Sequence, residues 1–186
     1  DTERGVLWVE TGTICQSLLQ ASNILTQRML FPQCAAEVTV DAGALKVGDH
    51  AGICALQGCY GMAAVTRRED GFYVVMKGRR AVDDSMQALP EDDLAGTEWE
   101  AVRIGQHSTV RLRIEADFAQ MKDEARFFYY KGDGDGGTWQ QIGAVQKLYF
   151  KLDHFAGCRF GLFVYATAQT GGRAGFSGFK YDSSRR

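Results

Sequence analysis

Two carboxylates, Glu115 and Asp117, are spaced so that they could act together in a glycosidase. They stand at i and i+2 in a run of alternating apolar and polar residues, so both side chains face the same side of a strand. A retaining glycosidase needs two carboxyl groups roughly 5 to 5.5 Å apart. The next position in this pattern holds Ala119 instead of an acid, and Arg111 and Arg113 alternate with the pair. The spacing therefore favours charges on a solvated strand face over a catalytic pair.

Metal-ligand patterns are weak in this chain. Asp133 and Asp135 lie in the run GDGDGG, but the chain continues into Thr138 without the bidentate Glu that an EF-hand loop needs. This run predicts a hairpin turn. Three histidines are dispersed without HxH or HExxH spacing: His50, His107 and His154. We assign no metal ligand, no cofactor and no catalytic residue, and a structural calcium ion held elsewhere stays an open alternative.

The five cysteines indicate free thiols. Their number is odd and they form no CxxC pair, which argues against a zinc ribbon and against a complete disulfide framework. Cys54 and Cys59 flank a turn and could approach each other, but two separately packed thiols are the favoured interpretation. Reduced thiols indicate a reducing compartment, so we expect a cytoplasmic protein, with secretion as the alternative.

Composition limits the domain count and the partners. The chain has 186 residues, of which 45% are hydrophobic and 24% charged, which suits a single domain spanning residues 1–186. A net charge of -2 leaves no basic excess for a nucleic acid backbone. No apolar run approaches the roughly 20 residues that a membrane span needs. We therefore expect neither nucleic acid nor a membrane as partner.

Short alternating runs predict strands along most of the chain. The clearest is Thr109 to Phe118, where every second residue is apolar. A single layer of so many strands would leave a broad apolar face in water, so two stacked antiparallel sheets are expected. The other predicted strands are Gly5–Val9, Asn23–Arg28, Ala35–Val40, Ala51–Leu56, Met62–Arg67, Phe72–Met76, Trp99–Ile104, Phe127–Tyr130, Phe160–Ala166 and Ala174–Tyr181.

Some segments carry further expectations. The run Phe160 to Tyr165 is apolar on both faces, so a second layer or a ligand groove must cover its outer side. Asp70 and Gly71 mark a turn between two strands. Residues Ile14 to Ala21 could form a helical turn or a loop, and Ala81 to Gly96 reads as a long surface loop. The fold class is all-β, a two-sheet antiparallel jelly-roll or concanavalin-like β-sandwich.

Two segments carry a family resemblance. The first contains Leu25-Thr26-Gln27-Arg28, Gly48-Asp49-His50-Ala51-Gly52, Ala55-Leu56-Gln57 and Tyr60-Gly61. The second contains Arg159-Phe160-Gly161-Leu162-Phe163, Tyr165-Ala166-Thr167 and Gln169-Thr170-Gly171-Gly172. Together they resemble the C-terminal concanavalin-like β-sandwich of glycoside hydrolase family 43 β-xylosidases, which is also classed as a xylan-binding accessory domain.

This resemblance implies a function in xylan degradation. In such enzymes, β-xylosidases or α-L-arabinofuranosidases, the catalytic carboxylates lie in a five-bladed β-propeller, and a loop of the sandwich places an aromatic side chain at the rim of its pocket. Phe155 stands in the corresponding region. The chain is then expected to be non-catalytic, to shape the substrate pocket of the propeller, and to be able to bind xylan or xylo-oligosaccharides.

Aromatic rings stack on sugar faces, while amides and arginines read sugar hydroxyls, so several further residues are candidates for substrate binding. A role in the core is the alternative for each of them, as for Phe155. Besides Phe155, the candidates are Tyr60, Gln57, Gln27, Arg28 and Tyr165.

The chain departs from this family at its N-terminal side. The family's first strand, with an Asp-Glu-Phe stretch and a Trp-containing segment, has no counterpart upstream of Gly5 to Val9. An unpaired sheet edge favours association, so a homo-oligomer is an alternative to a domain that works alone. Two other functions fit the same fold: a self-contained jelly-roll glycosidase or lyase, and a free-standing lectin-like sugar binder.

Overall fold

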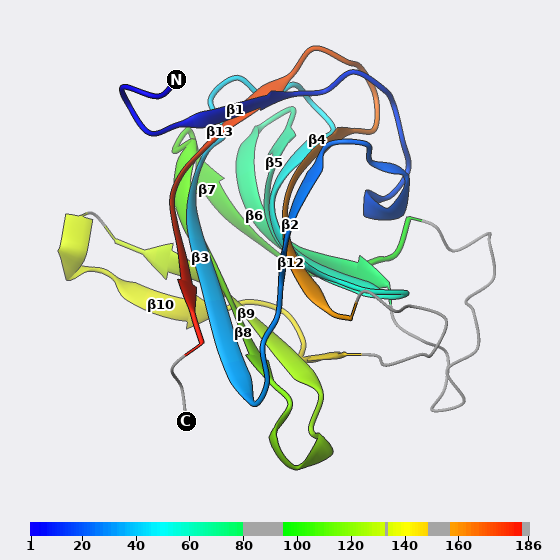
Figure 1. Cartoon of the computed structure of the whole chain (residues 1–186). Coiled ribbons are helices and arrows are strands. Elements are labelled where there is room, and N and C mark those ends of the chain that lie inside the picture. Colours follow the sequence, from blue (N-terminus) through cyan, green and yellow to red (C-terminus); the bar gives the residue numbers. More distant parts are fainter. Residues whose placement is uncertain (80–94, 133, 149–156, 184–186) are drawn as a thin grey trace.

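The protein is a β-sandwich in the computed structural model, which describes residues 1–79, 95–132, 134–148 and 157–183 (Figure 1). No α-helix occurs within these ranges. The strands are β1 (Leu7–Glu10), β2 (Ile24–Arg28), β3 (Gln33–Asp41), β4 (Asp49–Leu56), β5 (Tyr60–Arg68), β6 (Gly71–Arg79), β7 (Thr97–Gly105), β8 (Thr109–Asp117), β9 (Glu124–Lys131), β10 (Thr138–Gln141), β11 (Gln146–Lys147), β12 (Arg159–Ala166) and β13 (Arg173–Asp182).

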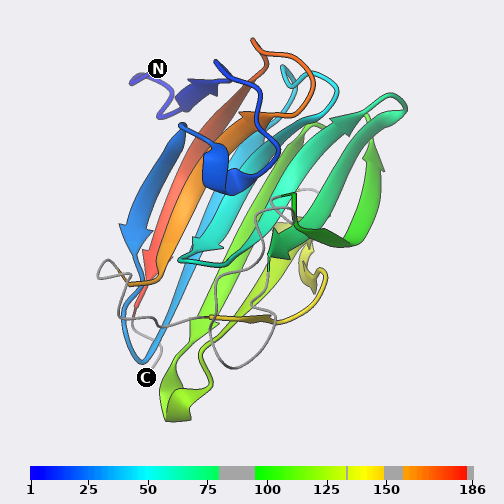
Figure 2. The same ribbon diagram turned by 90° about the vertical axis from the view of Figure 1, so that its right-hand side faces the viewer.

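Two antiparallel sheets lie face to face, as Figure 2 shows from the side. In sheet A the order is β1-β13-β3-β8-β9-β10, with β11 also paired to β9. In sheet B the order is β2-β12-β4-β5-β6-β7. The predicted fold class is therefore confirmed. Because β1 and β2 are both edge strands, one side of the sandwich is open between them.

The main core fills the space between the sheets. Strand β8 shows why, since Val110, Leu112, Ile114 and Ala116 point inward and are buried while its charged residues point outward. From the other sheet, residues such as Ile53 on β4 meet them. Strict alternation places one face of each strand in the core, as the sequence predicts.

A second apolar cluster covers the outer face of sheet B. Phe163 and Tyr165 on β12 belong to it, whereas Phe160 and Val164 belong to the main core. The segment before β2 lies over this face and includes the 3₁₀ turn η1 (Leu18–Gln20), with Leu18 fully buried. The strand that is apolar on both faces is thus covered on both sides, as predicted. The segment Ile14 to Ala21 contains one helical turn.

The turns match their sequence signals. Glu69 and Asp70 connect β5 to β6, and Gly71 has a φ of +137°, close against the backbone of Gly105. Strand β9 is joined to β10 through the glycine-rich run, so the predicted hairpin is confirmed. Strands β10 and β11 were not predicted, and most of the expected loop Ala81 to Gly96 lies outside the described residues.

None of the five cysteines forms a disulfide bond in this structure, and four of them are buried. Cys54 and Cys59 pack as two separate side chains. No helix in the described ranges is long and apolar enough to cross a membrane.

Candidate functional site

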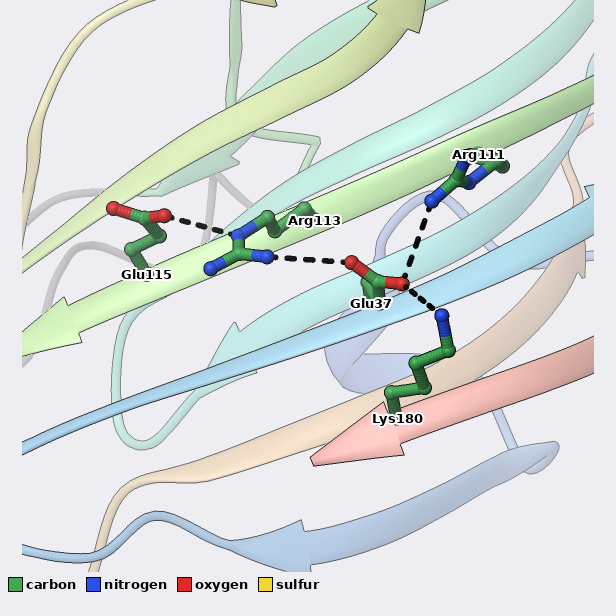
Figure 3. Close-up of polar contacts among 5 residues, drawn as sticks. All are labelled: Glu37, Arg111, Arg113, Glu115 and Lys180. Carbon is green, nitrogen blue, oxygen red and sulfur yellow. Dashed lines mark hydrogen bonds and ion pairs between the residues drawn. The ribbon is translucent and has the colours of Figure 1, made fainter. Parts of the chain in front are cut away.

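The carboxylates of sheet A's outer face are bound to cations (Figure 3). Glu115 on β8 accepts from Arg113 Nε at 2.9 Å, and Arg113 also contacts Glu37 on β3 at 3.3 Å. Glu37 further meets Arg111 at 3.6 Å and Lys180 at 3.1 Å. Burial opposes ionisation of Glu37, but Lys180, Arg111 and Arg113 outweigh it and lower the pKa of its carboxyl. This face is a charge ladder across three strands.

Asp117 does not form an acid-base pair with Glu115. Its Oδ2 accepts from Lys122 Nζ at 3.0 Å and its Oδ1 accepts from Ala119 N at 2.9 Å. Partial burial raises the pKa of Asp117, and these hydrogen bonds together with the Lys122 charge lower it by more. A general acid needs a raised pKa, so this arrangement fits the solvated strand face that the sequence favours.

A row of side chains crosses the outer face of sheet B at one end. Arg28 on β2 lies opposite Arg159 on β12, which lies opposite Leu56 on β4, and Leu56 lies opposite Tyr60 on β5. Arg79 on β6 continues the row beside Tyr60. Directly paired residues share a face of the sheet. We call Arg28, Arg159, Leu56, Tyr60 and Arg79 the arginine row.

Gln57 lies at the same end of the sheet, in the turn after β4. Its Oε1 accepts from Cys158 Sγ at 2.8 Å. Gly157 is the first described residue after Phe155, so the chain resumes beside Gln57. Phe155 itself lies outside the described residues. The structure therefore brings Arg28, Gln57 and Tyr60 to one end of sheet B.

Two buried donors at this end find no acceptor in the part of the chain that the structure describes. Arg159 donates from its terminal nitrogen to Thr26 Oγ1 at 3.2 Å, but its Nε has no hydrogen-bond partner in the described structure. The same holds for Gln57 Nε2. Arg28 and Arg159 make no ion pair with any described residue. An unsatisfied buried donor costs about 1–3 kcal/mol, so this end is suited to receive oxygen atoms from a partner or a ligand.

Gln27 and Tyr165 are placed elsewhere. Gln27 alternates with Arg28, so it points to the open side of the sandwich. There it lines a groove of about 400 Å³ together with apolar residues such as Leu25, Leu162 and Phe176. Tyr165 lies six residues beyond Arg159 on β12, about 20 Å away along the strand. The structure therefore places Gln27 and Tyr165 apart from the other described candidates for sugar binding.

The tyrosine rings of the predicted set are buried. Tyr60 is fully buried, and its hydroxyl donates to Ala95 O at 3.4 Å. Tyr165 is also buried and stacks on His50 with the ring centroids 4.9 Å apart. Burial, helped by the nearby charge of Lys77, lowers the pKa of His50 to about 3. Sugar stacking on either tyrosine stays a prediction and requires the covering residues to move.

Arg159 is the residue that sequence reasoning missed. It stands within the second family segment, but a lone arginine at the start of a strand gave no signal. Its position opposite Arg28 depends on strand register, which only the structure supplies. In the described residues, no cluster of three or more His, Cys, Asp or Glu could hold a metal ion.

Comparison with known proteins identifies a family and a set of related folds. A family model described as Beta xylosidase C-terminal Concanavalin A-like domain matches residues 2–182. Among curated proteins, no match was found. The solved structure "Bifunctional GH43-CE" from Bacteroides eggerthii is 34% identical with a TM-score of 0.84, and the match covers 98% of this chain and 22% of that chain.

Two further solved structures share the fold at lower identity. One, from work on engineering the active site of a GH43 glycoside hydrolase, is 23% identical with a TM-score of 0.81, over 96% of this chain and 34% of that chain. The xylan beta-1,4-xylosidase from Bacillus halodurans C-125 is 15% identical with a TM-score of 0.72, over 96% of this chain and 33% of that chain. This chain spans at most about a third of these three structures.

Proposed function

Since the chain belongs to the family of C-terminal concanavalin A-like domains of β-xylosidases, we propose that it shapes the substrate pocket of a catalytic propeller without catalysing a reaction itself. Family 43 glycoside hydrolases combine such a domain with a catalytic propeller and act on carbohydrates. The substrate that we infer is xylan or a xylo-oligosaccharide.

The observation that carries this proposal is the donor-rich end of sheet B. Among the described residues, Arg159 Nε and Gln57 Nε2 are buried without an acceptor, and Arg28 and Arg159 lie side by side without a carboxylate. Such an end gains stability when carbonyl, carboxylate or hydroxyl oxygens dock on it. The described chain resumes at Gly157, two residues after Phe155, and Cys158 lies beside Gln57 at this end. Contact with the propeller here would therefore direct Phe155 toward the pocket.

Substitution of Phe155 in the full-length enzyme tests the proposal. We expect Phe155→Ala to lower kcat/KM for xylobiose about tenfold, equivalent to about 1.4 kcal/mol of transition-state stabilisation. Trp8→Ala is the matched control, because Trp8 is an exposed aromatic residue on β1, at the other end of the sandwich (Figure 1). An unchanged kcat/KM for Phe155→Ala would remove Phe155 from the pocket.

A second variant tests contact between the propeller and the donor-rich end of sheet B. Arg159→Met keeps the aliphatic length of the side chain but removes the orphaned Nε donor. We expect kcat/KM for xylobiose to fall in the full-length enzyme while the unfolding free energy of the 186-residue chain stays level or rises. A loss of stability in the chain without a loss of activity would contradict a docking role for Arg159.

A further inference from the structure

The two most exposed large apolar side chains of the described structure lie at the end of the sandwich that carries the arginine row. Phe31 is 75% exposed and Met121 is 85% exposed. Leu30, beside Phe31, is 46% exposed. A single exposed apolar side chain is ordinary on a protein surface, whereas a group of them marks a contact surface. We call Leu30, Phe31 and Met121 the apolar tip.

Two neighbouring loops carry the apolar tip. The loop between β2 and β3 carries Leu30 and Phe31, and the 3₁₀ turn between β8 and β9 carries Met121. The two loops are joined where Phe118 N donates to Pro32 O at 2.9 Å. Both lie at the lower end of the molecule in the view of Figure 1. The three side chains therefore belong to one end of the sandwich.

The turn that presents Met121 has a strained backbone. Among the described residues, only Gln120, Met121 and Asp123 combine a side chain with a positive φ, at +55°, +57° and +46°. The left-handed region is unfavourable for residues with a Cβ, and such strain is concentrated at functional segments. The turn is fixed by Lys122, whose Nζ lies 3.0 Å from Asp117 Oδ2. The fold therefore holds Met121 in solvent at a cost in backbone energy.

The apolar tip is continuous with the arginine row. Met29, the residue before Leu30, donates from its N to Cys158 O at 3.0 Å. Cys158 in turn contacts Gln57, which carries one of the two donors without a described acceptor. Arg28 precedes Met29 and ends β2. Interfaces between proteins combine an apolar centre with arginines and hydrogen-bond donors, so this end of the sandwich has the composition of a docking surface.

We propose that the apolar tip anchors this domain on a catalytic propeller, with Phe31 inserted into an apolar pocket whose edge offers oxygen acceptors to Arg159 and Gln57. The inference rests on the proposed function. The propeller is the partner in reach, because this chain spans at most about a third of the structures that it matches, and the remainder of each is tethered to the matching domain. The segment that contains Phe155 also rejoins the described chain at this end, at Gly157.

Hydrogen–deuterium exchange in the full-length enzyme and in the 186-residue chain tests this contact. The backbone amides of residues 29–31 and 119–123 should exchange at least about tenfold more slowly in the enzyme, because the docked propeller excludes water from both loops. Residues 12–15, at the opposite end of the sandwich, should exchange equally in the two proteins. Equal exchange at both loops would overturn the proposal. Protection in the isolated chain that grows with its concentration would also overturn it, because a second copy would then cover the tip.

Substitution of Phe31 supplies the matched comparison. In the enzyme, Phe31→Asn should bring the exchange of residues 119–123 to within about twofold of the rate in the isolated chain, and Phe31→Leu should keep the protection because leucine is apolar. Ile14→Asn, which changes an exposed apolar residue at the opposite end, should have no effect. Undiminished protection in Phe31→Asn contradicts the anchoring role. The isolated chain with Phe31→Asn should unfold at the same urea concentration as the unsubstituted chain, because Phe31 is exposed, so misfolding would not explain a loss of protection.

This contact and the proposed function of Phe155 fail separately. An unchanged kcat/KM for Phe155→Ala together with protected loops removes Phe155 from the pocket and keeps the apolar contact. Unprotected loops together with a lowered kcat/KM for Phe155→Ala overturn the apolar contact alone.

Discussion

Gly172 shows how a single residue fixes the end of the sandwich opposite the arginine row. A Cβ at this position would overlap Asp49 Oδ2 and come within 3.0 Å of Lys46 N. Asp49 is fully buried, and its Oδ2 accepts from Lys46 N at 2.8 Å. The backbone of Gly172 is also hydrogen-bonded to Thr11 in both directions. The glycine in this family segment therefore provides space for a buried carboxylate.

We expect Gly172→Ala to lower the free energy of unfolding by about 3 kcal/mol, because the overlap involves a buried carboxylate and backbone that cannot move apart cheaply. Urea denaturation measures this change. Gly12→Ala is the control, since a Cβ at Gly12 meets nothing within 4 Å. Similar free energies of unfolding for the two variants would contradict the close packing of Gly172 against Asp49.

His50 makes stability depend on pH. Burial, and then the charge of Lys77, lower its pKa to about 3 from a usual 6.5, so the unfolded chain binds a proton in this window while the folded chain does not. The free energy of unfolding should therefore fall as the pH drops from 6.5 to 3, by at most about 1.4 kcal/mol per pH unit from this group.

Comparison with His50→Gln isolates this contribution. Urea denaturation at several pH values should give a shallower pH dependence for His50→Gln, because the variant has no imidazole to protonate on unfolding. Glu37 and Asp117, whose pKa values are lowered, also weaken the fold in acid, but they do so equally in both proteins. Equal slopes in the two proteins would show that His50 titrates normally in the folded state.

At the scale of elements, the charge ladder of sheet A links three neighbouring strands. Glu37 on β3 contacts cations on β8 and β13, and its side chain is only 13% exposed. Glu37→Gln would leave these cations close together without their shared carboxylate. We expect a loss of about 1–2 kcal/mol in the free energy of unfolding, less than for a fully buried pair because Lys180 is exposed.

Glu115→Gln is the matched variant for the ladder. Glu115 pairs with Arg113 and is 31% exposed, so we expect a loss of less than about 1 kcal/mol. The difference in the free energy of unfolding between the two variants should be smaller at high salt, because salt screens the exposed charges of the ladder. A larger loss for Glu115→Gln than for Glu37→Gln would contradict the central position of Glu37.

The strands that sequence reasoning found are those with a strong alternating pattern. Thr109 to Phe118 was predicted from alternation, and β8 ends one residue earlier. Strand β10 was missed because Thr138–Gln141 contains one apolar residue, and β11 because two residues carry no period. These strands form by pairing with β9, whose register is a tertiary property.

The candidate site was predictable only in part, for the same reason. Residue types suggested Arg28, Gln57 and Tyr60, and strand register brings them to one end of sheet B. Alternation turns Gln27 to the other face, and the length of β12 separates Tyr165 from the arginine row. The position of Arg159 beside Arg28 depends on a strand distant in sequence, which periodicity cannot supply.

For the whole molecule, the fold and the family match indicate an accessory domain. The ion pairs of Glu115 and Asp117 with cations on sheet A are consistent with it. The match covers residues 2–182, so it extends over both sheets. The self-contained glycosidase differs from both the accessory domain and the free lectin in what the 186-residue chain does by itself with xylan fragments. Hydrolysis by this chain separates the enzyme from the other two.

The most direct test is a calorimetric titration of the pure chain with xylohexaose, with the same sample assayed for released xylose. We predict no release of xylose at any pH between 5 and 8, because Glu115 and Asp117 are bound to cations rather than paired with each other. Binding heat without hydrolysis would add a xylan-binding role. Xylose release that is lost in Glu115→Gln would contradict the account and make the chain an enzyme.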